Sequence, residues 1–480
     1  MKLRQPFPPD ATRRERASVF IIVLWVCIGL VGIALYFANT MTYELRASDN
    51  RVSGLQADQA IEGAARYVAA ALQNFATNGA VPDYTQFKCE AVPIGDAKFW
   101  LIGRDPAATG SATEPFFSLV DEGGKLDLNT VSTNVLEYLP NMNLDYANAI
   151  MEWRGTNGNA SLDYTSLGYQ PKNAPFESVD ELRLVYGMTM DMLVGEDVNR
   201  NGILDKNEKD LNSSGGLDPG LLEYFTVNTR EPNFHFDSST MAATTLTNVN
   251  TATTNNFISM FQSAGTSTST RMAQQIYNYI HPSGGTGGTG GAGGAGSASA
   301  GTCSGMLQFA LFCKNAGMST DDFSRIADSV TTKTNTYITG RVNVNTASAD
   351  VLATLIMGSM GQNPDESTAV SAAQTLVTYR QQNPGNLNSI AWVIDALGNN
   401  SPVFAANALG GGDYLTTRSY QFTADIAAVG PYGRGYRRVK FYFDVSNGTP
   451  KILYRQDLSR LGWVLGEKTR EDLLANNNTP

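Results

Sequence analysis

The longest run of hydrophobic positions in the chain extends from Ser18 to Ala38 and contains no charged residue. At a rise of 1.5 Å per residue, an α-helix of this length spans about 31 Å, which matches the hydrocarbon core of a bilayer. Residues 1–17 carry more Lys and Arg than Asp and Glu, so the positive-inside rule keeps them in the cytoplasm. We therefore expect a single-pass anchor with a cytoplasmic leader, 1–17, and the bulk of the chain across the membrane.

Hydrophobic positions keep a helical spacing beyond the membrane run, as far as Asn78 and Gly79. The positions that carry this spacing are Leu45, Val52, Leu55, Ile61, Ala65, Val68 and Leu72. We predict one continuous helix over 18–78. Its second half is amphipathic, and its apolar face must pack against another element.

Strand-like patterns occur in two regions that are far apart in the sequence. The segments with alternating or clustered apolar and aromatic residues are 98–104, 116–120, 420–429, 437–445 and 451–457. Gly-Pro and Asn-Gly turns separate the last three segments, which predicts an antiparallel meander. We expect the early part, 79–130, and the late part, 415–480, to form one sheet that packs on the helix.

An inserted helical domain is predicted between these two parts, over 131–414, and a repeated motif organises it. The motif reads KLDLNTVS at 125–132, RVNVNTAS at 341–348 and, more loosely, LTNVNTAT at 246–253. In each copy a short strand ends at Asn-Thr, and a Thr or Ser can then cap the first turn of a helix. The pattern is similar to helix-hairpin-helix and SAM-like repeats. The predicted fold class is α+β, with a long N-terminal transmembrane helix on an antiparallel sheet and a large α-helical insertion.

Composition argues against nucleic acid as a partner of the insert. The chain has 35 Lys and Arg residues against 45 Asp and Glu, a formal net charge of −10. The repeats also lack the Gly-apolar-Gly hairpin and flanking basic residues that contact DNA phosphates. A signal-anchored periplasmic DNA receptor built on helix-hairpin-helix units is the rival interpretation. The tract of Gly, Ser, Thr and Ala over 283–301 is expected to be a flexible loop.

The junction between the leader and the apolar run, at Ala17 and Ser18, resembles the processing site of prepilins. In that family a prepilin peptidase cuts on the cytoplasmic side of the helix and methylates the new N-terminus. The resemblance implies that Ala17 is the last leader residue and Ser18 the first mature one. Gly is the usual residue where Ala17 stands, and an uncut signal anchor is the alternative. Most pilins also carry Glu at the fifth mature position, where this chain has Ile22.

In lacking Glu at the position of Ile22, the chain resembles the K-type minor pseudopilins of the type II secretion system. Its segment 171–188 also resembles part of their inserted domain. The resemblance implies a protein of the bacterial inner membrane, with its bulk in the periplasm. It also implies I-type and J-type minor pseudopilins as partners, with the major pseudopilin below them. The expected role is to form the tip of a periplasmic fibre that helps to export folded proteins across the outer membrane.

Ile22 is the residue expected to define the tip position. It lacks the carboxylate that, in ordinary pilins, is thought to attract the N-terminus of a neighbouring subunit inside the membrane, where an unpaired charge is costly. A minor pilin of a type IV pilus is a further alternative, which prepilin processing does not separate from the first.

Residues 197–208, DVNRNGILDKNE, have the pattern of a calcium loop. Oxygen-bearing side chains stand at positions 1, 3, 5, 9 and 12 of an EF-hand-type loop, with Gly202 at the sixth. The predicted ligands are Asp197, Asn199, Asn201, the Ile203 carbonyl, Asp205 and Glu208. We expect a structural Ca²⁺ that holds the fold of the insert. The alternative is a surface turn rich in Asn, Asp and Gly.

Catalysis is not expected. The two histidines, His235 and His281, have no Cys or His neighbours at zinc-ligand spacing, and the sequence has neither a Gly-x-Ser-x-Gly elbow nor a phosphate-binding loop. Cys303 and Cys313 are candidates for a disulfide, because this part of the chain is expected to lie in an oxidising compartment. Spacing alone does not establish that their Cα atoms approach closely enough.

Overall fold

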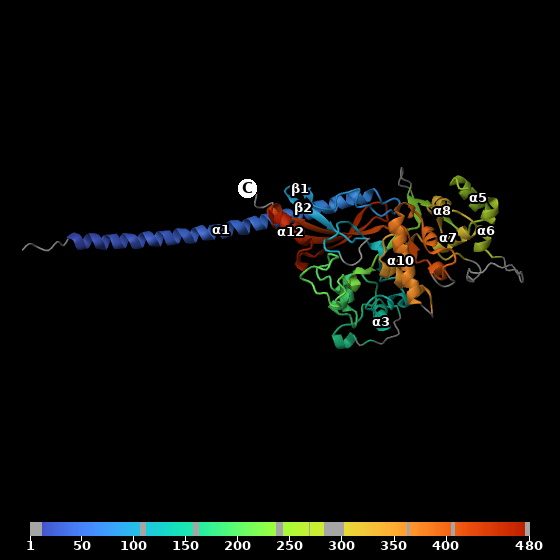
Figure 1. Cartoon of the computed structure of the whole chain (residues 1–480), viewed down its shortest axis with the longest axis horizontal. Helices are drawn as coiled ribbons and strands as arrows, with labels where there is room; N and C mark the ends of the chain where they lie inside the picture. Colours follow the sequence, from blue (N-terminus) through green and yellow to red (C-terminus); the bar gives the residue numbers. More distant parts are fainter. Residues whose placement is uncertain are drawn as a thin grey trace, which may run out of the picture.

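The computed structural model of the chain describes residues 12–105, 112–156, 162, 164–236, 243–267, 269–282, 302–361, 365–404 and 409–475. Its longest element is helix α1, Thr12–Gln73, the first half of which extends away from the rest of the molecule (Figure 1). Every side chain from Val19 to Val52 is exposed. Among the described residues, α1 is the one helix that is long and apolar enough to cross a membrane, as a single-pass anchor or a signal sequence does.

The second half of α1 packs on an antiparallel sheet, which is a pilin-like architecture. One face of the helix is buried from Ser53 onward. Its buried apolar residues are mostly small: Ala57, Ala60, Ile61, Ala64, Ala65, Val68 and Leu72. Small side chains allow the helix to lie close to the sheet, where Phe99 and Phe422 are part of the same hydrophobic core. The packing of an amphipathic face on another element is therefore confirmed. The predicted face starts too early, however, because Leu45, Val52 and Leu55 are exposed and burial begins only where the helix reaches the sheet.

The regular helix ends at Gln73, before the predicted end at Asn78. Shorter-range bonds follow it, from Asn74 N to Ala71 O and from Phe75 N to Leu72 O, so the chain tightens into turns. The turns end at Gly79, whose φ of +66° is accessible to glycine at little cost.

Six strands in the described part of the chain form the sheet that carries α1. The path runs β1-β2-β14-β15-β16, and β3 also pairs with β14. Their bounds are β1 Val92–Ile94, β2 Ala97–Ile102, β3 Val120–Asp121, β14 Gln421–Val429, β15 Arg437–Asp444 and β16 Lys451–Asp457. The predicted meander is confirmed as β14, β15 and β16. Because β2 pairs antiparallel with β14, the early and late parts belong to one sheet, as expected.

The predicted strand over 116–120 is wrong for most of its length. Phe117 makes only an isolated bridge to Ile102, and the regular strand β3 starts at Val120. Pro115 stands just ahead of the segment and cannot donate a main-chain hydrogen bond, which disfavours a regular ladder there.

The two faces of the sheet are covered by different parts of the chain. Alternation along β2 directs Phe99 and Leu101 toward α1, while Trp100 and Ile102 belong to a separate apolar cluster with the C-terminal segment. This segment leads into helix α12, Gly466–Ala475. Polar residues of the same second face contact the insert; Tyr442 Oη, for example, lies 3.1 Å from Thr226 Oγ1.

The inserted helical region is present and consists of three modules with one plan. Each module, defined by its first and last strand, begins with a two-residue strand at the Asn-Thr motif and ends with a second two-residue strand that pairs parallel with the first. The first module contains β4 Leu126–Asp127, α2 Thr133–Leu136, α3 Leu144–Trp153, α4 Met190–Val194 and β5 Phe225–Thr226. The second contains β9 Thr247–Asn248, α5 Thr254–Ser263, α6 Thr270–Ile280, α7 Met306–Asn315, α8 Thr320–Ala327 and β10 Val330–Thr331. The third contains β12 Val342–Asn343, α9 Ala349–Ser359, α10 Glu366–Gln382, α11 Trp392–Leu397 and β13 Leu415–Thr416.

Two short antiparallel pairs complete the described strands. They are β6 Arg230–Pro232 with β11 Tyr337–Thr339, and β7 Phe234–Phe236 with β8 Ala243–Thr245.

The asparagine of each Asn-Thr motif closes its module. Asn129 Nδ2 donates to Val227 O at 2.8 Å, and Asn250 Nδ2 donates to Thr332 O at 3.1 Å, in each case just past the closing strand. Asn345 makes the corresponding bond to Thr417 O at 3.5 Å. The expected helix caps are found at Thr253 and Ser348. Ser132 makes no such bond to the described residues.

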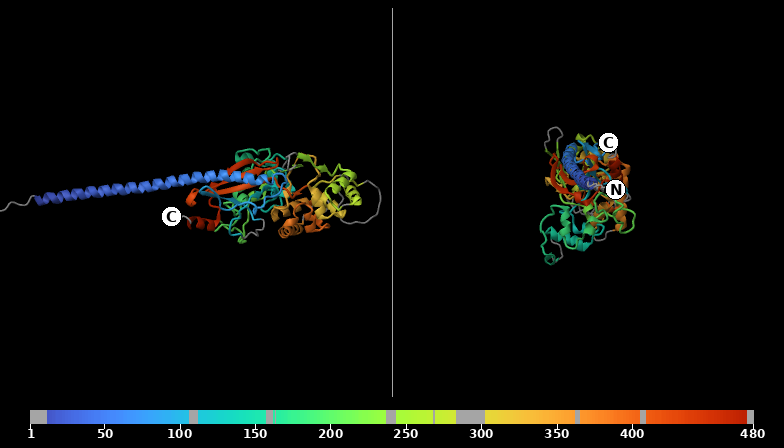
Figure 2. Two further views of the ribbon diagram at one scale, coloured as in Figure 1. Left: turned by 90° about the horizontal axis from the view of Figure 1, so that it is seen from above. Right: turned by 90° about the vertical axis from the view of Figure 1, so that its left-hand side faces the viewer.

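The three modules share one hydrophobic core. The second and third modules lie at the end of the molecule farthest from the N-terminus (Figures 1 and 2). Helix α12 lies at the other end of the head, near the point where α1 leaves it (Figure 1). The helix-hairpin-helix geometry of the modules and the boundaries 131 and 414 stay predictions, and the Gly-rich tract 283–301 lies outside the described residues.

Candidate metal centre

The predicted calcium loop, 197–208, follows α4 and adopts a tight, irregular backbone. Arg200 and Gly202 have positive φ values of 60° and 84°. Glycine adopts such a φ at little cost, and a Cβ at position 202 would lie 2.9 Å from Arg104 Cδ. Asp197, Asn199 and Asn201 are all buried, so the loop is not a simple solvated turn.

The carboxylates of the loop are held in place by main-chain amides. Asp197 accepts from Asn201 N at 2.9 Å and from Gly202 N at 2.7 Å. Glu208, the predicted twelfth-position ligand, accepts from Asn199 N at 3.1 Å and from Asp205 N at 3.0 Å. The first and last acidic residues of the loop are therefore oriented by the backbone that lies between them.

The side-chain amides of the loop gather on Asp205. Asn199 Nδ2 and Asn201 Nδ2 both donate to Asp205 Oδ2, the latter at 2.9 Å. Asn199 Oδ1 is buried and has no hydrogen-bond partner among the described residues, which is costly for a polar atom. Rotation of either side-chain amide by 180° exchanges its nitrogen for its oxygen. The amide oxygen would then lie beside the Asp205 carboxylate, where it could bind a cation.

The set as a whole is suited to a hard cation. It contains carboxylate, amide and carbonyl oxygens, the ligand types that Ca²⁺ prefers. Within the described ranges, no three His, Cys, Asp or Glu side chains lie close enough to hold a metal, so the structure does not bring the carboxylates of Asp197, Asp205 and Glu208 together. A cation at the loop would also need amide and carbonyl oxygens. Burial raises the pKa of the Asp197 carboxyl to about 6, against the opposing charge of Arg104. A bound cation would favour the ionised form.

A second loop of the same construction, 210–218, follows the first and was not predicted from the sequence. It reads DLNSSGGLD. Asp210 accepts from Ser214 N at 3.1 Å and from Gly215 N at 2.9 Å, at the same offsets as the bonds to Asp197. Ser213 and Gly215 have positive φ values of 58° and 72°, as the fourth and sixth residues of the first loop do. The two loops therefore share one local conformation.

The carboxylate that completes the second loop comes from outside it. Glu196 Oε1 accepts from Leu211 N at 2.6 Å, and its Oε2 accepts from Asp218 N at 3.0 Å. Glu208 has the corresponding role in the first loop. The signal that could have found this loop is the Asp-x-Asn-x-x-Gly-x-Leu-Asp spacing, which lacks an acidic residue at position 12.

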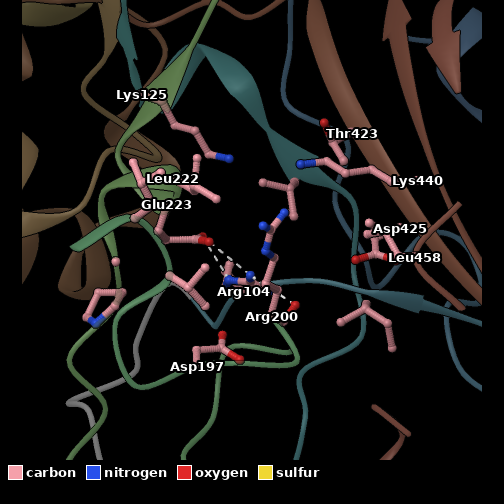
Figure 3. Close-up of a pocket in the computed structure, with 16 residues that line it drawn as sticks. Arg104, Lys125, Asp197, Arg200, Leu222, Glu223, Thr423, Asp425, Lys440 and Leu458 are labelled. Carbon is pink, nitrogen blue, oxygen red and sulfur yellow. Dashed lines mark hydrogen bonds and ion pairs between the residues drawn. The ribbon is translucent and has the colours of Figure 1, made fainter. Parts of the chain in front are cut away.

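A small cavity of about 60 Å³ is lined by Asp197 and Arg200 of the first loop and by Thr423, Asp425 and Lys440 of the sheet. Figure 3 shows Arg104 between Glu223 and Arg200, with Asp197 beside it. Arg104 Nε donates to Glu223 Oε1 at 2.8 Å, and Arg104 Nη2 lies 3.4 Å from Arg200 O. The Arg104 charge therefore lies between the insert and the sheet, where it also faces the Asp197 carboxylate.

The other predicted site residues are distributed over the molecule. Cys303 and Cys313 are free, buried thiols, and burial raises the pKa of Cys303 to about 12. A disulfide between them stays a prediction. Ala17 and Ser18 lie in the helical backbone of α1, and Ile22 lies in its exposed part. His235 is exposed on β7, and the His281 ring lies 4.6 Å from that of Tyr277.

Neither the known protein-family models nor the curated proteins contain a match to this chain.

Proposed function

We propose that this chain is a K-type minor pseudopilin of the type II secretion system, which forms the tip of a periplasmic pseudopilus. The observation that carries the proposal is the order of parts along the molecule. An exposed apolar helix leads into a pilin-like head, and the second and third modules of the helical insert lie at the end of the molecule farthest from the N-terminus (Figure 1). In a fibre of parallel helices, this end faces away from the membrane.

The insert explains why such a subunit would be terminal. The three modules share a large core, and the second and third extend beyond the sheet, in the space that a subunit stacked above would need. Ile22 supports the same role from the membrane side. An apolar side chain at this position offers no carboxylate to the N-terminus of a neighbouring subunit.

Calcium has a structural part in this proposal. Asp197, Asn199, Asn201, Asp205, Glu208 and the Ile203 carbonyl would hold one ion. The second loop, with Asp210, Asn212, Asp218 and Glu196, would hold another. The ions would supply positive charge to the two acidic loops and so stabilise the native insert, because only the folded chain assembles these sites.

Partner binding tests the proposed function. The full chain, extracted in mild detergent, is expected to co-purify with coexpressed I-type and J-type minor pseudopilins, with an N-methylated Ser18 as its first residue by mass spectrometry. Co-purification with type IV minor pilins instead would assign it to a pilus. An intact leader, no pseudopilin partner and salt-sensitive DNA binding would support the receptor interpretation.

Calorimetry tests the calcium part independently. Titration of the chelator-treated chain with CaCl₂ should release or absorb heat, and EGTA should lower the melting temperature. The absence of both effects would refute calcium binding and leave the proposed partners untouched.

A further inference from the structure

The C-terminal segment covers the sheet face opposite α1. Val464 and Leu465 are fully buried there, in a cluster with Trp100, Ile102, Ala427 and Val429. The Trp463 ring lies 5.2 Å from that of Tyr436. Removal of this segment would expose a continuous apolar surface at the end of the head from which α1 leaves (Figure 1).

The first calcium loop touches this segment directly. Asn199 Nδ2 lies 3.4 Å from Trp463 O, and Lys206 forms an ion pair with Glu467 in the first turn of α12. Asn199 is a predicted calcium ligand, and Lys206 stands between two others. The residues that would bind the ion and those that hold the C-terminal segment are therefore the same short stretch of chain.

A buried arginine fixes the loop on its other side. Arg438 of β15 is wholly buried and donates through Nη2 to Arg200 O at 2.8 Å and through Nη1 to Asn199 O. Its charge is balanced by Asp425, which accepts from Nε at 2.9 Å. The loop thus has one support in the sheet and a second contact in the C-terminal segment, with Asn199 common to both.

Without a cation, the acidic groups of the loop, Asp197, Asp205 and Glu208, each accept hydrogen bonds from amides within the loop. A bound Ca²⁺ would add positive charge to the loop and fix the Asn199 side chain, whose Nδ2 contacts Trp463 O. We propose that calcium binding at 197–208 controls the docking of the C-terminal segment, 463–473, on the sheet. The proposal rests on the calcium site proposed above. By linkage, docking of the segment must also tighten calcium binding by the same factor.

Hydrogen exchange on the full detergent-solubilised chain tests the first direction. With saturating CaCl₂, exchange in 463–473 is expected to be about tenfold slower than in EGTA, within the usual range of couplings between sites. MgCl₂ in place of CaCl₂ is the ion control. In the Glu208→Gln variant, residues 463–473 should exchange rapidly even with CaCl₂. The control variant Glu366→Gln changes an exposed acidic residue on α10 and should behave like the wild type.

Calorimetry with CaCl₂ on two matched variants tests the reciprocal direction. Leu465→Ala weakens docking of the segment and should weaken calcium binding about tenfold. Leu376→Ala removes an equally buried leucine from α10, away from the loop, and should leave calcium affinity unchanged.

Each outcome has one meaning. Calcium heat with unchanged exchange in 463–473, or equal losses of affinity in both leucine variants, would overturn the coupling while the calcium site stands. No heat in the wild type would refute the site and the coupling together, and the partner experiment would still decide the pseudopilin proposal.

Discussion

Arg438 and Asp425 form a buried ion pair between neighbouring strands of the sheet. The register of β14 and β15 places Arg438 opposite Ala427, so the two charged residues are diagonal neighbours on one face. The same guanidinium donates to the carbonyls of Asn199 and Arg200. One arginine therefore joins both strands to the first calcium loop.

We expect Arg438→Met to destabilise the fold severely. The change leaves Asp425, whose side chain is 9% exposed, without its partner. Breaking a buried pair in this way costs about 3–5 kcal/mol. Urea unfolding of the detergent-solubilised chain, followed by tryptophan fluorescence, should show this loss. The double variant Arg438→Met with Asp425→Leu should recover much of it, because it removes the uncompensated charge as well. A loss below about 1 kcal/mol, typical of a surface pair, would contradict the expectation.

A second prediction concerns the closure of the third module. Asn345→Ala removes the acceptor of Trp392 Nε1 and the donor to Leu387 O. Each buried group left unsatisfied costs about 1–3 kcal/mol. Hydrogen exchange should accelerate in β12 and β13 and stay unchanged in β9 and β10. Asn386→Ala, at an exposed position of the same module, is the control and should have little effect. Acceleration throughout the insert would argue against local closure.

The sequence predicted the elements in which many apolar residues recur at regular spacing. The long helix and the meander carry enough apolar positions to be recognised, and the Asn-Thr motif is visible because three copies exist. The closing strands β5, β10 and β13 are two residues long, so they show no period. Each closing strand is instead held beside the first strand of its module by a hydrogen bond from an asparagine far away in the sequence. These asparagines are Asn129, Asn250 and Asn345.

The candidate calcium centre was predictable only in part. The first loop supplies its own acidic residue at position 12, whereas the second borrows Glu196, which precedes it. A contiguous pattern does not contain such a residue. The contact between Arg438 and the loop could not be predicted from the sequence either, because the pairing of Arg438 with Asp425 depends on the register of the sheet.

The second loop gives a prediction about stoichiometry. Wild-type chain should bind two Ca²⁺ ions, and Glu196→Gln should bind one, since a neutral amide is a weaker calcium ligand than a carboxylate. Glu208→Gln should remove the other ion. Calorimetric titration with CaCl₂ measures both numbers. One ion in the wild type, unaffected by Glu196→Gln, would restrict calcium binding to 197–208.

The last prediction separates two explanations of tip placement. Ile22→Glu restores the carboxylate that pilins carry at this position, so it would allow the mutant to attract the N-terminus of a neighbour within the membrane. If the missing carboxylate alone kept the subunit at the tip, the mutant should spread along the fibre. We expect it to stay at the tip, because the second and third modules still occupy the space beyond the sheet (Figure 1). Immunogold labelling of isolated fibres measures the distribution. Label along the whole fibre would show that the insert does not block stacking, and Ile22→Val controls for the substitution itself.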